Sequence, residues 1–256
     1  MGIIGWATVT PLAGLLIERL GLYVPFAGYA AMLVAAVFAL FFVRGSAKPR
    51  TAAQTAARVP VRQMINSLAR SRTMIGMALA FTVIWIATMG RSTFESLFMT
   101  SLGANTTIIG IAGTVSALFE VPAMLLADRL VRRHGPGRIL RISLLAQAAS
   151  FLPVVLFPSI PSFFILRIMA SIAMSLNVPA YYRYLVESAP AGQGGTVVSL
   201  FDVTLRNGVS LLAAPLAGYL FDLLGAYWLY PIGLGGCLLA WLILEILARP
   251  LPASTV

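Results

Sequence analysis

The sequence has few charged residues. Only 10% of its 256 residues are Asp, Glu, Lys or Arg, whereas 59% are hydrophobic and the mean hydropathy is +0.92. A soluble domain carries roughly 25% charged residues, because its surface must face water. The composition therefore excludes a soluble enzyme, a secreted disulfide-rich domain and a disordered chain, and it is typical of a protein whose solvent is lipid.

Residues that support catalysis or metal binding are also scarce. The single cysteine, Cys237, excludes an intrachain disulfide and a cysteine-based metal site, and the single histidine, His134, lies in a basic segment. The sequence has no glycine-rich phosphate loop, no Gly-x-Ser-x-Gly motif and no His-Glu-x-x-His motif. We therefore expect no cofactor, no metal and no enzymatic activity.

The formal net charge of +10 does not indicate nucleic-acid binding. The basic residues cluster in segments between long apolar runs, and no basic face carries interleaved aromatic residues. We expect membrane lipid, rather than nucleic acid, to surround this chain.

Long apolar runs make up most of the sequence. A membrane-spanning helix needs about 20 predominantly apolar residues. On this criterion the sequence predicts an all-α polytopic membrane protein with eight transmembrane helices. The predicted spans are residues 1–17, 23–43, 74–99, 108–127, 139–157, 162–184, 196–221 and 226–247.

The distribution of basic residues predicts the orientation. Fourteen of the 18 Lys and Arg residues flank the spans on one side, whereas the opposite side carries only Arg19. Since positively charged loops remain on the cytoplasmic side, we expect a plasma-membrane protein with both termini in the cytoplasm.

The longest hydrophilic segment predicts a domain boundary. After Pro60, the apolar residues Val61, Met64, Ile65 and Leu68 have helical spacing, which predicts an amphipathic helix at the membrane surface. We therefore divide the chain into two transmembrane helices (1–44), a cytoplasmic linker (45–72), a six-helix half (73–248) and a cytoplasmic tail (249–256).

An internal repeat relates the two ends of the chain. Residues 11–30 and 215–234 are identical at eight of twenty positions, beginning with Pro-Leu-Ala-Gly in both copies. The repeat pairs the first predicted span with the seventh, in the same orientation. Such a parallel repeat of six-helix units resembles the major facilitator superfamily.

This resemblance implies a transporter in which the first span corresponds to the family's fifth helix. The family has twelve helices, so we expect this chain to lack the first four. The chain would then consist of the last two helices of the N-terminal half, followed by the whole C-terminal half. Residues 128–133, Asp-Arg-Leu-Val-Arg-Arg, resemble the family's cytoplasmic loop motif. The resemblance assigns Asp128, Arg129, Arg132 and Arg133 to this motif, and it implies that Asp128 acts at a helix end in the closed cytoplasmic gate. The alternative is an ordinary basic loop.

Three charged residues in the third and fourth spans are candidates for the transport site. Arg91 and Glu95 lie four residues apart on one helix face, so they either contact the solute or neutralise each other. Glu120 is an isolated carboxylate followed by Pro122, and it is a candidate for proton coupling or for a structural hydrogen bond. The Glu-x-Pro sequence weakly resembles the branch of the family that contains lactose permease and nucleoside symporters.

The sixth and seventh spans add further candidates. Arg167 is expected either to reach the membrane surface or to bind an anionic group. Asn177 is expected to bind solute or to pack beside a kink at Pro179. Asp202 and Arg206 repeat the four-residue pairing, for which gate closure or helix packing is favoured over solute contact.

The leading hypothesis is a secondary transporter that moves a small solute together with a proton or another cation. A cavity between the third, fourth, sixth and seventh spans is expected to hold that solute. A truncated protein without transport activity and a membrane-embedded enzyme are the alternatives. Because the chain is expected to lack four helices, we expect transport to require those helices or a partner chain that supplies them.

Overall fold

The computed structural model describes residues 16–17, 19, 21, 23–40, 71–190 and 192–248, and this part of the chain contains helices and no strand. Its long helices are α2 (Tyr23–Leu40), α4 (Arg72–Ser101), α5 (Thr106–His134), α6 (Pro136–Leu156), α7 (Ile160–Ser188), α9 (Arg206–Leu224) and α10 (Leu229–Leu247). Three short segments accompany them, namely α8 (Gly194–Ser199), the π-helical η2 (Leu200–Leu205) and the 3₁₀-helical η3 (Ala226–Trp228).

Six helical units in the described residues are long and apolar enough to cross a membrane, which confirms the last six predicted spans as helices. One of these units runs through α8, η2 and α9, and another combines η3 with α10. The prediction of eight spanning helices is not matched. Helix α2 has 18 residues, fewer than the roughly 20 that a span needs, and most of the first predicted span lies outside the described residues.

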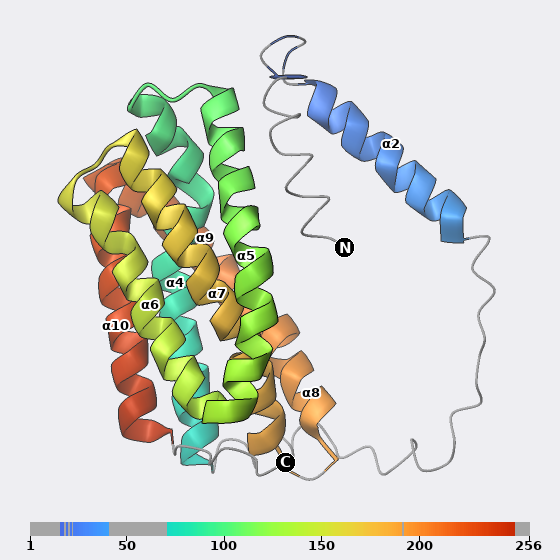
Figure 1. The fold of residues 1–256 in the computed structure, drawn as a ribbon, viewed down its shortest axis with the longest axis vertical. Coiled ribbons are helices and arrows are strands. Elements are labelled where there is room, and N and C mark those ends of the chain that lie inside the picture. The colour runs from blue at the N-terminus through green and yellow to red at the C-terminus, as the bar shows by residue number, and fades with distance from the viewer. Residues whose placement is uncertain are drawn as a thin grey trace.

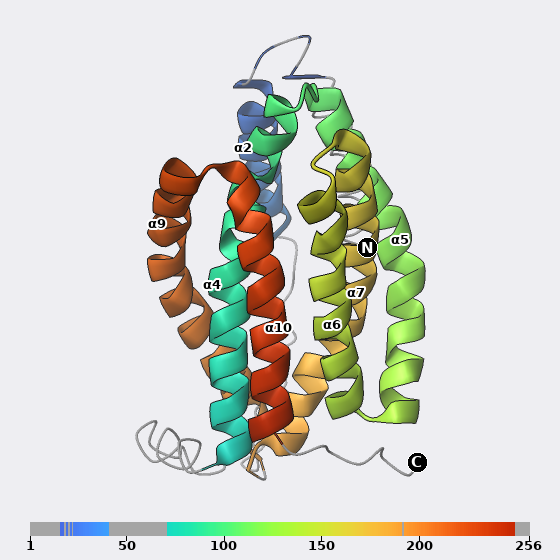
Figure 2. The ribbon, with the colours of Figure 1, turned by 90° about the vertical axis from the view of Figure 1, so that its left-hand side faces the viewer.

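The six units form an arc. Helices that pack extensively follow the order α9, α4, α10, α6, α7 and α5, while α5 and α9, at the two ends of the arc, make no extensive contact. Figure 2 shows α9, α4 and α10 on one side of the bundle and α6, α7 and α5 on the other. The packing order leaves room for a cavity on the concave side of this arc.

Close packing between α4 and α10 depends on small residues. A Cβ atom built on Gly236 of α10 would lie 2.1 Å from the Cβ of Ala87 on α4, and one on Gly90 would lie 2.7 Å from a methyl group of Leu229. Small residues at helix interfaces let the backbones of membrane helices approach each other. This contact fixes the position of α4, which carries much of the candidate site.

Helix α2 lies apart from this arc (Figure 1). Every residue from Phe26 to Ala39 is exposed, although the segment is apolar. Such a surface is compatible with lipid or with other helices, because apolar side chains are stable in either environment.

The repeat predicted from the sequence has a structural counterpart in one turn. Gly21 and Gly225 both have positive φ angles, of 92° and 86°. The backbone N–H of each donates to the carbonyl four residues earlier, Ile17 and Phe221 respectively, at 3.0 and 2.9 Å. Only glycine adopts such a φ angle without strain, which explains why both copies keep glycine where a helix ends.

The basic motif after the fourth predicted span is helical rather than a loop. Helix α5 continues to His134, and Gly135 alone connects it to α6. The prediction that residues 128–133 form a loop was therefore wrong. Arginine favours helices, and the pairing of Asp128 with Arg132 one turn apart supports the last two turns of α5.

The predicted amphipathic linker helix, residues 41–43 and the tail from residue 249 lie outside the described residues.

Candidate functional site

A cavity of about 520 Å³ opens between the helices of the arc. This volume lies within the range of small-molecule binding sites. Its lining mixes charged, neutral polar and aromatic side chains from α4, α5, α6, α7, η2 and α9. The residues that line it are Phe81, Ile84, Trp85, Thr88, Met89, Arg91, Ser92, Ser116, Glu120, Gln147, Arg167, Ala170, Ser171, Met174, Asn177, Val178, Tyr181, Tyr182, Asp202, Arg206 and Ser210.

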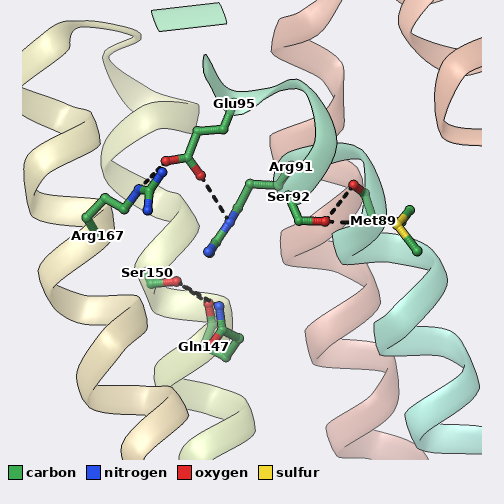
Figure 3. A network of polar contacts seen from close by, with 7 residues as sticks. All are labelled: Met89, Arg91, Ser92, Glu95, Gln147, Ser150 and Arg167. Carbon is green, nitrogen blue, oxygen red and sulfur yellow. Dashed lines mark hydrogen bonds and ion pairs between the residues drawn. The ribbon is translucent and has the colours of Figure 1, made fainter. Parts of the chain in front are cut away.

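Three charged residues form an Arg–Glu–Arg cluster, which comprises Arg91 and Glu95 of α4 and Arg167 of α7 (Figure 3). The Nε atom of Arg167 donates a hydrogen bond to Oε1 of Glu95, and the Nε atom of Arg91 lies 3.3 Å from Oε2. The Glu95 side chain is only 5% exposed and does not line the cavity, whereas both arginines do. The cluster therefore presents positive charge to the cavity.

Arg91 is held by an aromatic ring as well as by Glu95. Its guanidinium carbon lies 5.6 Å from the centroid of the Phe151 ring, which is fully buried on α6. A cation over an aromatic face is attracted by the ring quadrupole. The terminal Nη1 atom of Arg91 is nevertheless buried without a hydrogen-bond partner among the described residues.

Glu120 of α5 also lines the cavity. The hydrogen bond that links this residue to α7 runs from the hydroxyl of Ser175 to the backbone carbonyl of Glu120, at 3.2 Å. Its carboxylate makes no hydrogen bond or ion pair with any residue that the structure describes. Every other carboxylate that lines the cavity or contacts its arginines has a charged partner, so Glu120 is electrostatically distinct.

A second set of charged residues lies at the π-helical segment of the seventh span. Asp202 belongs to the π-helical segment η2, accepts a hydrogen bond from the hydroxyl of Tyr182, and has Oδ1 4.0 Å from Nη1 of Arg206. Single π-helical turns are frequent at functional sites. The structure places Asp202 and Arg206 in the cavity wall, although gate closure or helix packing was favoured from the sequence.

The two charged groups lie at different depths. Arg167 and Tyr182 are 15 residues apart on α7, which corresponds to about 22 Å along the helix axis. Between them, Asn177 lines the cavity and its Nδ2 atom donates to the hydroxyl of Ser143 on α6, at 2.9 Å. One residue thus both lines the cavity and ties two helices together.

Among the neutral residues of the lining, the sequence indicated Asn177 but not the others. Gln147 is the contribution of α6, a helix that was not expected to line the cavity, and Trp85 belongs to the aromatic wall. Tyr181 also lines the cavity, and its hydroxyl is buried without a hydrogen-bond partner among the described residues. Polar or aromatic residues inside an apolar run were the available signal, but such residues also occur at lipid interfaces and helix contacts.

The basic motif lies outside the cavity. Asp128 pairs with Arg132, and both side chains are more than half exposed at the end of α5. Arg129 and Arg133 lie in the same turns. At this same end of the bundle, Nε of Arg141 on α6 lies 2.8 Å from Oε2 of Glu245 on α10. The sequence did not indicate this interhelical ion pair. No group of three His, Cys, Asp or Glu residues suited to a metal ion occurs in the described ranges.

Comparison with known proteins identifies the family of this helical arrangement. The family model of the major facilitator superfamily matches residues 81–255. The chain is 28% identical to maltose permease of Geobacillus stearothermophilus over 206 residues, which cover 75% of this chain and 52% of the permease.

Two further relatives are similar to this chain at lower identity. An uncharacterized transporter of Bacillus subtilis (strain 168), YwbF, is 25% identical over 69% of this chain and 44% of its own length. The multidrug resistance protein MdtG of Klebsiella pneumoniae (strain 342) is 25% identical over 85% of this chain and 53% of its own length. The chain thus spans about half the length of the curated relatives it matches. Because the family model covers more than half of the chain, this protein belongs to the major facilitator superfamily.

Proposed function

We propose that this protein is a secondary active transporter that binds a small solute in the cavity and moves it by alternating access. The observation that carries this proposal is the cavity of about 520 Å³, walled by membrane-spanning helices and lined by charged side chains. Charged residues at membrane depth are costly, and they typically mark substrate or ion pathways. The relatives named above support transport rather than enzymatic activity.

The proposal includes an ion gradient as the energy source. Glu120 is the candidate that takes up a coupling proton, because its carboxylate lines the cavity without a cationic partner in the described residues. In transporters built from two halves, the solute binds between the halves and one half rocks against the other. We propose that the arc from α4 to α10 is one such half and that transport also needs helices facing its concave side.

The proposed transport can be tested in liposomes that contain the purified 256-residue chain. Once the N-terminal six helices of the maltose permease are co-reconstituted to supply the facing half, we expect preloaded gluconate or maltose to drive counterflow of the same radiolabelled solute. Glu95→Gln and Asp202→Asn variants should alter the rate of that counterflow. Protein-free vesicles are the control. If folded protein exchanges neither solute, even when co-reconstituted with the N-terminal six helices of the maltose permease, the transport proposal is wrong.

The proposed orientation places the basic end of the bundle in the cytoplasm, together with both termini. Cysteines introduced at Thr55 and Thr106 should then react with a membrane-impermeant maleimide from opposite sides, with Thr55 on the cytoplasmic side. The native Cys237 is fully buried and can be replaced by alanine to give a cysteine-free background. Labelling of both positions from one side would refute this topology. Thr55 itself lies outside the described residues.

A further inference from the structure

We infer that the Arg–Glu–Arg cluster binds an anionic group of the solute, so that the solute is an organic carboxylate or phosphate. This inference rests on the proposed function, since it names the class of solute that the same cavity would carry. It is independent of the coupling role proposed for Glu120.

The first argument is charge. Arginine remains protonated in proteins, so Arg91 and Arg167 supply two positive charges against the single carboxylate of Glu95. Both arginine side chains are only 20% exposed. An uncompensated charge with little solvation is unfavourable. An anion that enters the cavity would compensate the excess charge at this end.

The second argument is the direction of the donors. Both arginines contact Glu95 through Nε, and a guanidinium has further N–H donors on its two terminal nitrogens. Nη1 of Arg91 is buried without a partner among the described residues, and Figure 3 shows the end of this side chain pointing away from Glu95. Arginine binds carboxylate and phosphate oxygens through two parallel hydrogen bonds, so this free donor fits such an oxygen.

The third argument is the remainder of the cavity. Phe81 and Trp85 lie on the same helix as Arg91, their ring centroids are 5.7 Å apart, and both line the cavity. They provide an apolar wall for the body of a solute whose anionic group is held by the cluster. A neutral polyol such as a saccharide would leave the two arginines of the cluster with Glu95 as their single anionic partner.

The inference can be tested by binding small aromatic anions to the purified full chain in detergent. We expect benzoate, phenyl phosphate or both to change the fluorescence of Trp85 saturably, whereas benzyl alcohol, the neutral analogue, should not. Comparing the two anions distinguishes a carboxylate from a phosphate solute. A Trp85→Phe variant shows whether the signal arises in the cavity.

Variants of the cluster are expected to change affinity in opposite directions. Arg91→Gln should weaken anion binding by at least about tenfold, because a bidentate charged contact is lost. Arg91→Lys, which keeps the charge but not the fork, should give an intermediate loss. Glu95→Gln should strengthen binding, because it removes the carboxylate that competes for both arginines. Arg132→Gln, on the exposed end of α5, is the matched control and should leave affinity unchanged.

Three results would overturn the inference. Neither anion binds, or benzyl alcohol binds as tightly as benzoate, or Glu95→Gln weakens binding as much as Arg91→Gln in folded protein. The outcomes separate this inference from the transport proposal. Maltose counterflow without anion binding would contradict the anion site alone, whereas anion binding without any counterflow would contradict transport alone.

Discussion

Replacement of Gly236 by alanine should lower the free energy of unfolding by about 2–3 kcal/mol, near the upper end for overpacking a well-packed interior. The added Cβ would lie 2.1 Å from the Cβ of Ala87, on the facing side of α4. A methyl group bonded directly to the backbone cannot rotate away, so α4 and α10 must separate. The same separation should displace Arg91, which lies one turn beyond Ala87 on α4.

The neighbouring glycine provides a matched control. Gly235 is exposed, and a Cβ built on it meets nothing within 4 Å. Gly235→Ala should therefore be neutral or stabilise α10 by up to about 1 kcal/mol, because alanine favours helices over glycine. The two variants have the same composition and lie on the same helix, so they differ only in what the new methyl group meets.

A double variant tests the cause directly. Ala87→Gly removes the atom that the new methyl group would meet, so Ala87→Gly combined with Gly236→Ala should recover most of the lost stability. Reversible unfolding in mixed detergent micelles, followed by circular dichroism, measures the free energy of unfolding. The four proteins compared are the unsubstituted chain, the Gly235→Ala and Gly236→Ala variants, and the double variant. Equal stabilities of the Gly235 and Gly236 variants, or no recovery in the double variant, would show that this contact does not limit the helix spacing.

Most spanning helices could be predicted from the sequence, because a helix needs about 20 apolar residues to cross the hydrocarbon core, and such runs are visible in the sequence. Helix ends were less predictable. The predicted fourth span ends at Ala127, where charged residues begin with Asp128, but α5 continues to His134. Helix formation in these turns depends on helix propensity and on the pairing of Asp128 with Arg132. A hydropathy pattern contains neither kind of information.

The candidate site could be predicted only in part. Arg91, Glu120 and Arg167 were identifiable because a charge inside an apolar run is costly and unusual. The pairing of Arg91 with Glu95 was also identifiable from its four-residue spacing. The partner of Arg167 was not, since its ion pair with Glu95 joins residues 72 positions apart. Rotation of each helix about its axis decides such contacts, and it depends on packing between helices rather than on the pattern within one run. Gln147 was missed for this reason.

Replacement of Glu120 by glutamine should reduce solute accumulation driven by a proton gradient to the level of protein-free liposomes. If the proposed coupling is correct, the carboxylate must gain and lose a proton in each cycle, and an amide of nearly the same shape cannot. Counterflow between two pools of solute requires no net proton movement, so the variant should retain it. This combination separates coupling from solute binding.

The structural surroundings of Glu120 make this substitution interpretable. The hydrogen bond to Ser175 uses the backbone carbonyl of Glu120, which glutamine retains. Removing one partner of a buried ion pair destabilises proteins strongly. No cation among the described residues contacts the Glu120 carboxylate, so the variant leaves no buried arginine unpaired. We therefore expect the thermal stability of Glu120→Gln in detergent to stay close to that of the unsubstituted protein.

A second carboxylate provides the control for this experiment. Glu187, near the end of α7, is paired with Arg183 at 2.7 Å and does not line the cavity. Glu187→Gln should retain both gradient-driven accumulation and counterflow, because Glu187 does not line the cavity through which the solute and the coupling proton are proposed to move. Undiminished accumulation by folded Glu120→Gln would reduce Glu120 to a residue of the cavity wall. Loss of counterflow together with accumulation would instead assign it to solute binding, since an exchange cycle without net proton movement fails only when the solute is not held.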